Sequence, residues 1–160
     1  MKKAFPIALI ILGVVFLGAG AYTVNRGFDA KDMVRSELVA QRITTPADAS
    51  IPNARVDDPA TAKSMAEIID KHALAITGGK TYSEMERTDP LRNTAFQAST
   101  LRTSLYTSVM AFNVADLVLG IGALLAVLGL AVGGLGVALA GLAIPSFARR
   151  VHVEPIAAPH

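Results

Sequence analysis

The sequence predicts an all-α membrane protein in which two transmembrane helices form a hairpin and carry a small helical extracytoplasmic domain. Three observations lead to this fold class. The apolar fraction of 52% and the mean hydropathy of +0.45 are too high for an ordinary soluble domain of 160 residues. The apolar excess lies in two blocks without a charged residue, 4–24 and 117–143. The 80 residues from 25 to 104 carry helix-start and helix-stop signals.

The first apolar block is long enough to cross a membrane. Its 21 residues would measure about 31 Å as a helix, which matches a hydrocarbon core of about 30 Å. Ala19-Gly20-Ala21 satisfies the small-residue rule for signal-peptide cleavage. The apolar run continues past that point to Val24 and is longer than a signal-peptide core, so an uncleaved anchor is favoured and cleavage stays the alternative.

The following segment is predicted to begin with a charged amphipathic helix over 28–43 and a loop over 44–58. Asp58-Pro59 then combines an N-cap acid with a proline at the first helical position, and Gly78-Gly79 is the predicted end of that helix. Because the chain has no cysteine, this domain must be stabilised by helix packing, by the membrane helices or by a partner.

Two more helix signals follow. Thr81 and Glu84 have the spacing of a capping box, which suggests a short helical turn. Asp89-Pro90 repeats the acid-proline start. After it, apolar side chains recur at helical spacing toward the second apolar block, at Leu91, Ala95, Ala98, Leu101, Leu105, Val109 and Phe112. We therefore expect an unbroken helix, with 105–116 as its interfacial part.

The second apolar block, 117–143, is predicted as a single span of about 40 Å that tilts or protrudes. A hairpin of two spans is disfavoured, because 124–127 contains no turn-forming residue. A turn at Gly133-Gly134 would leave a third span well short of the ~17 residues required.

Charge predicts the orientation. Residues 25–104 contain 11 Lys/Arg and 11 Asp/Glu, so the basic surplus lies at Lys2, Lys3, Arg149 and Arg150. The protein is expected in the plasma membrane of the cell. By the positive-inside rule, both the N-terminus (1–3) and the tail (144–160) are expected on its cytoplasmic side. A nucleic-acid partner is excluded on this pattern, because it would require a clustered basic stripe.

Two runs carry a resemblance to a known family. They are AEIIDKHALAITGGKTYSEMERTDP at 66–90 and ASTLRTSLYTSVMAF at 98–112. The chain resembles, over about residues 1–132, a family of small actinobacterial two-span membrane proteins often labelled aromatic ring-opening dioxygenase. The glycine-rich continuation 133–144 and the tail depart from it. The resemblance implies two spans with a short outer loop and brings no established activity.

The ligand inventory does not fit the dioxygenase label. Mononuclear iron oxygenases need about three protein ligands, commonly two His and a carboxylate. His72 is predicted outside, whereas His152 and His160 are predicted inside, so no two can meet in one copy. Thr77-Gly78-Gly79-Lys80-Thr81 ends like a phosphate-binding loop but lacks its first glycine and its preceding strand, so no nucleotide is expected.

No catalytic residue, cofactor or metal site is predicted, and the expected function is non-enzymatic. The chain is expected to be an accessory or structural subunit of a larger membrane or cell-envelope complex, or a homo-oligomer. The alternatives are a metal-binding or oxidoreductase-type enzyme in which neighbouring copies add Glu67 or Asp70 to His72, and a secreted or anchored interaction module after signal cleavage.

The helix-packing candidates are small residues of the second block, Gly122, Gly129, Gly133 and Gly136, whose spacing lets helices approach closely in lipid. Packing on the first span, against Gly13, Gly18 and Gly20, and packing on another protein are both open. The polar candidates Asn113 and Asp116 lie one turn apart at the outer end of this block, where hydration or a hydrogen bond within the hairpin is favoured over a functional role.

Overall fold

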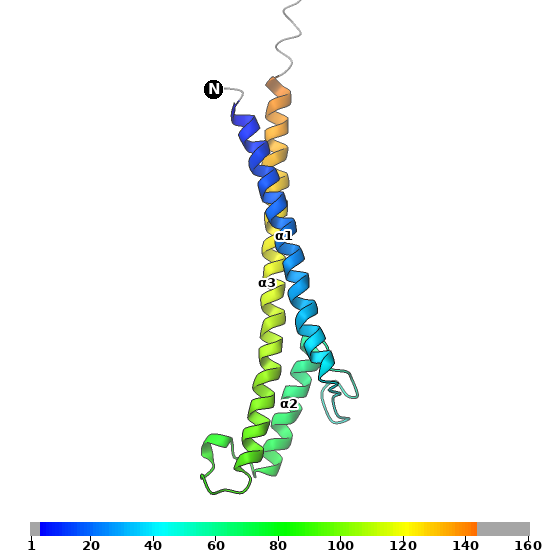
Figure 1. Cartoon of the computed structure of the whole chain (residues 1–160), viewed down its shortest axis with the longest axis vertical. Coiled ribbons are helices and arrows are strands. Elements are labelled where there is room, and N and C mark those ends of the chain that lie inside the picture. The colour runs from blue at the N-terminus through cyan, green and yellow to red at the C-terminus, as the bar shows by residue number, and fades with distance from the viewer. Residues whose placement is uncertain (1–3, 144–160) are drawn as a thin grey trace, which may run out of the picture. The chain divides into compact units, whose positions relative to one another are not determined.

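The computed structural model describes residues 4–143, and within them the chain is all-helical, as predicted. The helices are α1 (Ala4–Ala40), α2 (Pro59–Ile76) and α3 (Arg92–Ala143), with a single 3₁₀ turn, η1 (Tyr82–Glu84), and no strand among the described residues (Figure 1). Both α1 and α3 are long and apolar enough to cross a membrane by length and composition. The tail and the N-terminal lysines lie outside the described residues.

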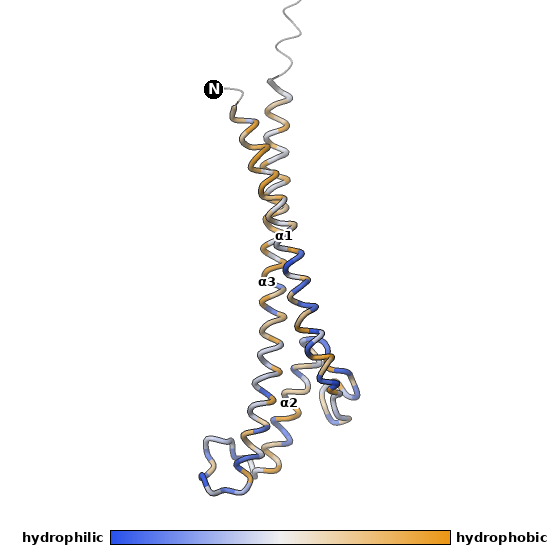
Figure 2. The backbone as a smooth tube through the Cα atoms, in the orientation of Figure 1, coloured by the Kyte–Doolittle hydropathy of each residue, from blue (hydrophilic) through white to orange (hydrophobic). Residues whose placement is uncertain are grey.

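The chain divides into two compact units. We call the first, with described residues 4–24 and 120–143, the apolar unit, and the second, residues 25–119, the polar unit. Figure 2 shows the difference in composition: the apolar unit is mostly hydrophobic, whereas the hydrophilic positions gather in the polar unit.

The expectation of a separate helix over 28–43 is wrong. Residues 25–40 continue the first apolar block as the second part of one 37-residue helix, α1. No proline follows Pro6 until Pro46, so nothing interrupts the backbone hydrogen-bond ladder at the change from apolar to polar sequence. The helix ends three residues earlier than predicted, at Ala40, and Arg42 has a left-handed φ of 53°.

The predicted signals around α2 are confirmed. The Asp58 side chain accepts a 2.8 Å hydrogen bond from the Thr61 backbone N–H, and the Thr61 hydroxyl closes the capping box. At the other end Gly78 has φ +66°, and the Gly79 N–H bonds to the Leu74 carbonyl at 2.7 Å, which satisfies an orphan carbonyl of the last turn. The capping box of Thr81 and Glu84 is also present, on η1.

The third helix is unbroken over 52 residues, as predicted, but it begins at Arg92 rather than Pro90. The Asp89 carboxylate accepts a hydrogen bond from the Leu91 N–H at 2.8 Å, and the Arg92 N–H bonds to the Asp89 carbonyl at 3.1 Å. This local turn holds 89–92, so the first helical hydrogen bond runs from Ala95 to Leu91.

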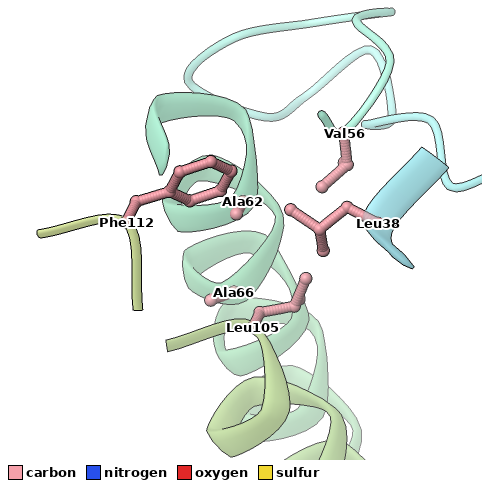
Figure 3. Close-up of a cluster of buried hydrophobic side chains, with 6 residues drawn as sticks. All are labelled: Leu38, Val56, Ala62, Ala66, Leu105 and Phe112. Carbon is pink, nitrogen blue, oxygen red and sulfur yellow. The ribbon is translucent and has the colours of Figure 1, made fainter. Parts of the chain in front are cut away.

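The polar unit has a small hydrophobic core shared by α1, α2, α3 and the loop before α2. Figure 3 shows its six buried side chains, and Val56 is fully buried among them. The members are Leu38, Val56, Ala62, Ala66, Leu105 and Phe112. The apolar positions predicted along α3 are therefore buried in part: Leu105 and Phe112 belong to this core, whereas Leu101 is exposed.

The loop over 41–58 is held on α2 by buried hydroxyls. Thr45 donates to the Ile51 carbonyl at 2.6 Å and accepts from the Ala54 N–H at 2.9 Å. Ser64, on α2, accepts the Ile51 N–H at 2.9 Å. Both hydroxyls are nearly inaccessible to solvent, and both are satisfied. The loop is thus an ordered part of the polar unit.

Candidate functional site

Glycines spaced seven residues apart bring α1 and α3 into close contact within the apolar unit. They lie at Gly13 and Gly20 on α1 and at Gly122, Gly129 and Gly136 on α3. A Cβ added at Gly20 would lie 2.7 Å from the Gly122 carbonyl oxygen, and one added at Gly129 would lie 2.7 Å from the Leu17 nitrogen. Contacts this close to backbone leave no room for any side chain at these positions.

The pairings show the direction of the contact. Gly122 meets Val24 and Gly20, Gly129 meets Leu17 and Gly13, and Gly136 meets Ile10 and Pro6. Higher residue numbers on α3 thus meet lower residue numbers on α1, so the two helices run in opposite directions. A seven-residue repeat on both helices keeps one face of each helix against the other. Figure 1 shows these two segments beside each other.

Among the predicted packing residues, Gly122, Gly129 and Gly136 lie within this contact, and a Cβ on Gly133 would lie 3.6 Å from the Gly13 Cα. By contrast, an added Cβ at Gly18, Gly120 or Gly134 would meet nothing within 4 Å. Of the three first-span glycines expected as packing partners, Gly13 and Gly20 lie in the contact, whereas Gly18 does not. The seven-residue spacing of Gly13, Gly20 and Gly27 is visible in the sequence, and it is the signal that distinguishes them from Gly18.

The two polar candidates of α3, Asn113 and Asp116, have different surroundings within the polar unit. Asp116 accepts a 2.6 Å hydrogen bond from the Lys31 ammonium of α1, so both charges are paired although both side chains keep access to solvent. Asn113 is exposed on α3. The Asp116 carboxylate thus connects the two long helices of this unit.

His72 has a carboxylate partner in the structure. Its Nε2 lies 2.8 Å from the Asp48 carboxylate, and Lys71 approaches the same carboxylate at 3.8 Å. The hydrogen bond from His72 holds the pKa of Asp48 below its ordinary value. Sequence reasoning identifies no aspartate beside His72. Asp48 lies on a loop and His72 on a helix, 24 positions apart, and no sequence spacing indicates such a pair.

Within residues 4–143, no three His, Asp or Glu side chains come close enough to hold a metal ion. His152 and His160 lie outside the described residues. The Thr77–Thr81 stretch is the stop of α2 followed by the cap of η1, and a helix rather than a strand precedes it. The His72–Asp48 pair is half-exposed, and no nucleophile is hydrogen-bonded to it in the described structure.

A hollow of about 520 Å³ lies in the polar unit between the end of α1, α2 and α3. Its volume is in the range of small-molecule pockets, and its walls are mainly apolar, with Leu38, Met65 and Leu105 among them. Glu37 is the one ionisable side chain of the lining. The hollow can therefore accept an apolar group, but its lining provides no acid–base pair.

Comparison with known proteins gives no assignment: no protein-family model, no curated protein and no solved structure matches the chain.

Proposed function

We propose that the chain is an integral membrane protein of the plasma membrane, with the apolar unit as a two-span transmembrane hairpin and the polar unit on the outer side. It acts without catalysis, as an accessory or structural subunit that contacts membrane proteins or its own copies. One observation carries the membrane assignment. Only 17% of the most apolar window of α1, and 11% of that of α3, is buried within the protein.

Exposure of this kind separates a membrane span from the core helix of a soluble protein. Phe5, Val14, Leu124 and Leu130 each keep more than 60% of their surface accessible, within segments that contain no charged residue. In water this surface would be strongly unfavourable at about 25 cal/mol per Å². Hydrocarbon is the environment in which exposure of apolar side chains on all sides of such helices is favourable.

The glycine contact supports the same proposal. Lipid tails are as apolar as leucine, so helices in a bilayer gain little from hydrophobic burial against each other. They associate instead through close backbone approach at small residues. The distances at Gly13, Gly20 and Gly129 describe such an approach.

The basic flanks support an orientation with both termini in the cytoplasm. Lys2 and Lys3 precede the first span and Arg149 and Arg150 follow the second, whereas the polar unit between them has balanced charge. The resemblance to actinobacterial two-span proteins implies the same arrangement.

The packing of the first span supports its retention. Cleavage after Ala21 would remove Gly13 and Gly20, and with them the surface that covers Gly122 and Gly129. α1 also runs through the cleavage motif as continuous helix. The alternative of a secreted module is therefore the less favoured one, and the mass of the mature chain distinguishes the two.

The proposal is tested on the full chain expressed in its membrane. After alkaline carbonate washing it should remain in the membrane pellet with the intact mass of residues 1–160, and in mild detergent it should co-purify with a membrane protein or as an oligomer. Recovery in the carbonate supernatant would contradict the membrane assignment. An isolated monomer without any partner would contradict the subunit role, and a mass beginning at Tyr22 would contradict the first span.

A further inference from the structure

A second seven-residue repeat runs along the face of α3 that turns away from the core of the polar unit. All its members are exposed, and three of the largest are Phe96, Met110 and Leu117, each with more than half of its surface accessible. We call this face the outer seam, and it comprises Phe96, Ser99, Thr103, Tyr106, Met110, Asn113 and Leu117. Alternating steps of three and four residues are the pattern of a helix that pairs with another helix along its length.

The outer seam contains a hollow of about 320 Å³ whose lining has a particular order. The lining residues are Ser99, Arg102, Thr103, Tyr106, Thr107 and Met110. They make two sets at positions i, i+3, i+4 and i+7: one begins at Ser99 and the other at Thr103. Four residues in this order form the hole that receives a side-chain knob from a facing helix.

Arg102 and Tyr106, two of the lining residues, make contacts within the polar unit. Arg102 donates a 2.9 Å hydrogen bond to Asp70 of α2, and its guanidinium lies 5.8 Å from the centre of the Tyr106 ring. Side chains that are already ordered lose less conformational entropy when a partner packs on them.

We propose that a second copy of this chain packs on the outer seam, parallel and in register. The parallel direction rests on the proposed function, because copies inserted in one membrane with one orientation present α3 in the same direction. In such a pair Thr103 of one copy enters the hole of Ser99, Arg102, Thr103 and Tyr106 on the other. Tyr106 enters the next hole, of Thr103, Tyr106, Thr107 and Met110. The residues that form these two holes are together the six that line the hollow.

The available area agrees with a dimer. Phe96, Tyr106, Met110, Val114 and Leu117 each keep between 36% and 63% of their surface exposed on or beside the seam. At about 100 Å² for each such side chain, the pair would bury on the order of 1,000 Å², close to the lower limit for a specific interface. Asn113 of each copy would face its counterpart, and a polar residue at one core position of a coiled coil specifies register.

Cysteine crosslinking of the full chain in its membrane tests the pairing, because the native chain has no cysteine. In a parallel, in-register pair, Ser99 and Thr103 each face the same residue of the other copy, within the roughly 6 Å between Cα atoms that a disulfide requires. Ser99→Cys and Thr103→Cys should therefore form covalent dimers under mild oxidation. Ser104→Cys is the matched control, since Ser104 is an exposed serine of the same helix outside the seam.

A second variant tests the apolar contribution. Met110 is exposed, so Met110→Lys should not impair folding of one copy, but it would place a charge in the dimer seam. Added to Ser99→Cys, it should lower the crosslinked fraction about tenfold, which corresponds to roughly 1.4 kcal/mol.

The outcomes separate the two proposals. Ser99→Cys chains that stay in the carbonate-washed membrane as monomers would overturn the pairing and leave the two-span proposal intact. Equal crosslinking at Ser104→Cys, or an adduct with the mass of another protein, would also overturn the pairing. Recovery of the chain in the soluble fraction would overturn both.

Discussion

The substitution Gly20→Ala tests the glycine contact of the apolar unit, and the chain provides a matched control two residues away. A Cβ at Gly20 would lie 2.7 Å from the Ala126 nitrogen and from the Gly122 oxygen, both of which are backbone atoms. A Cβ at Gly18 meets nothing within 4 Å. Both changes are Gly→Ala inside the same helix, so the gain of about 0.5–1 kcal/mol in helix propensity is common to them.

The difference between the two variants therefore reports the steric cost alone. Ordinary van der Waals contact of a Cβ begins near 3.4 Å, so at Gly20 the helices must separate by several tenths of an ångström along a backbone that cannot rotate away. Insertion of one methyl group into a well-packed contact costs typically 1–3 kcal/mol. We expect Gly20→Ala to be less stable than Gly18→Ala by this amount.

The chain contains neither tryptophan nor cysteine, which makes site-specific labels the natural probe. Dyes on Ile11→Cys and Leu135→Cys, two exposed positions on α1 and α3, report the distance between the helices by energy transfer. Titration of mild detergent micelles with a denaturing detergent then gives the free energy of helix separation for each variant. Equal stabilities of the Gly18→Ala and Gly20→Ala proteins would refute the proposed packing.

Further predictions concern three residues of the polar unit. Asp58→Ala removes the N-cap acceptor of the Thr61 N–H and should cost about 1 kcal/mol in thermal melts followed by circular dichroism. Because that hydrogen bond lowers the pKa of Asp58, its stabilisation is complete above the ordinary value of 3.8 and is lost as the pH falls through the lower folded pKa; Asp58→Asn should remove this acid-dependent component. His72→Ala should raise the pKa of Asp48 toward 3.8 in an NMR titration of the carboxyl carbon, and an unchanged pKa would contradict the pairing. Val56→Ala opens a cavity at a fully buried position and should lower the free energy of unfolding by about 1–3 kcal/mol; a neutral result would contradict the burial of Val56 in this core.

The features that could be predicted from the sequence are those encoded by neighbouring residues. The Asp58 cap, the stop at Gly78 and the capping box of Thr81 each involve groups within five residues of one another. Backbone groups at helix ends need a partner, and short polar side chains or glycine provide it locally. The structure confirms these local signals, which do not depend on distant segments of the chain.

The features that could not be predicted depend on segments far apart in the chain. The Asp48–His72 hydrogen bond, the Ser64 hydroxyl under the loop and the choice of Lys31 as the partner of Asp116 join residues separated by 13 to 85 positions. The end of the first apolar block was also a poor guide to the end of α1. Hydropathy reports the environment of a segment, whereas continuity of a helix depends on backbone hydrogen bonds, which polar residues make equally well.

The central claim, that α1 and α3 span a membrane with the polar unit outside, is tested most directly by cysteine accessibility in intact cells. Lys63→Cys places a thiol on an exposed position of α2, and Ala158→Cys places one in the tail. We expect a membrane-impermeant maleimide to label the Lys63→Cys chain in intact cells and the Ala158→Cys chain only after lysis. Labelling of both before lysis, or of Ala158→Cys alone, would contradict the proposed topology.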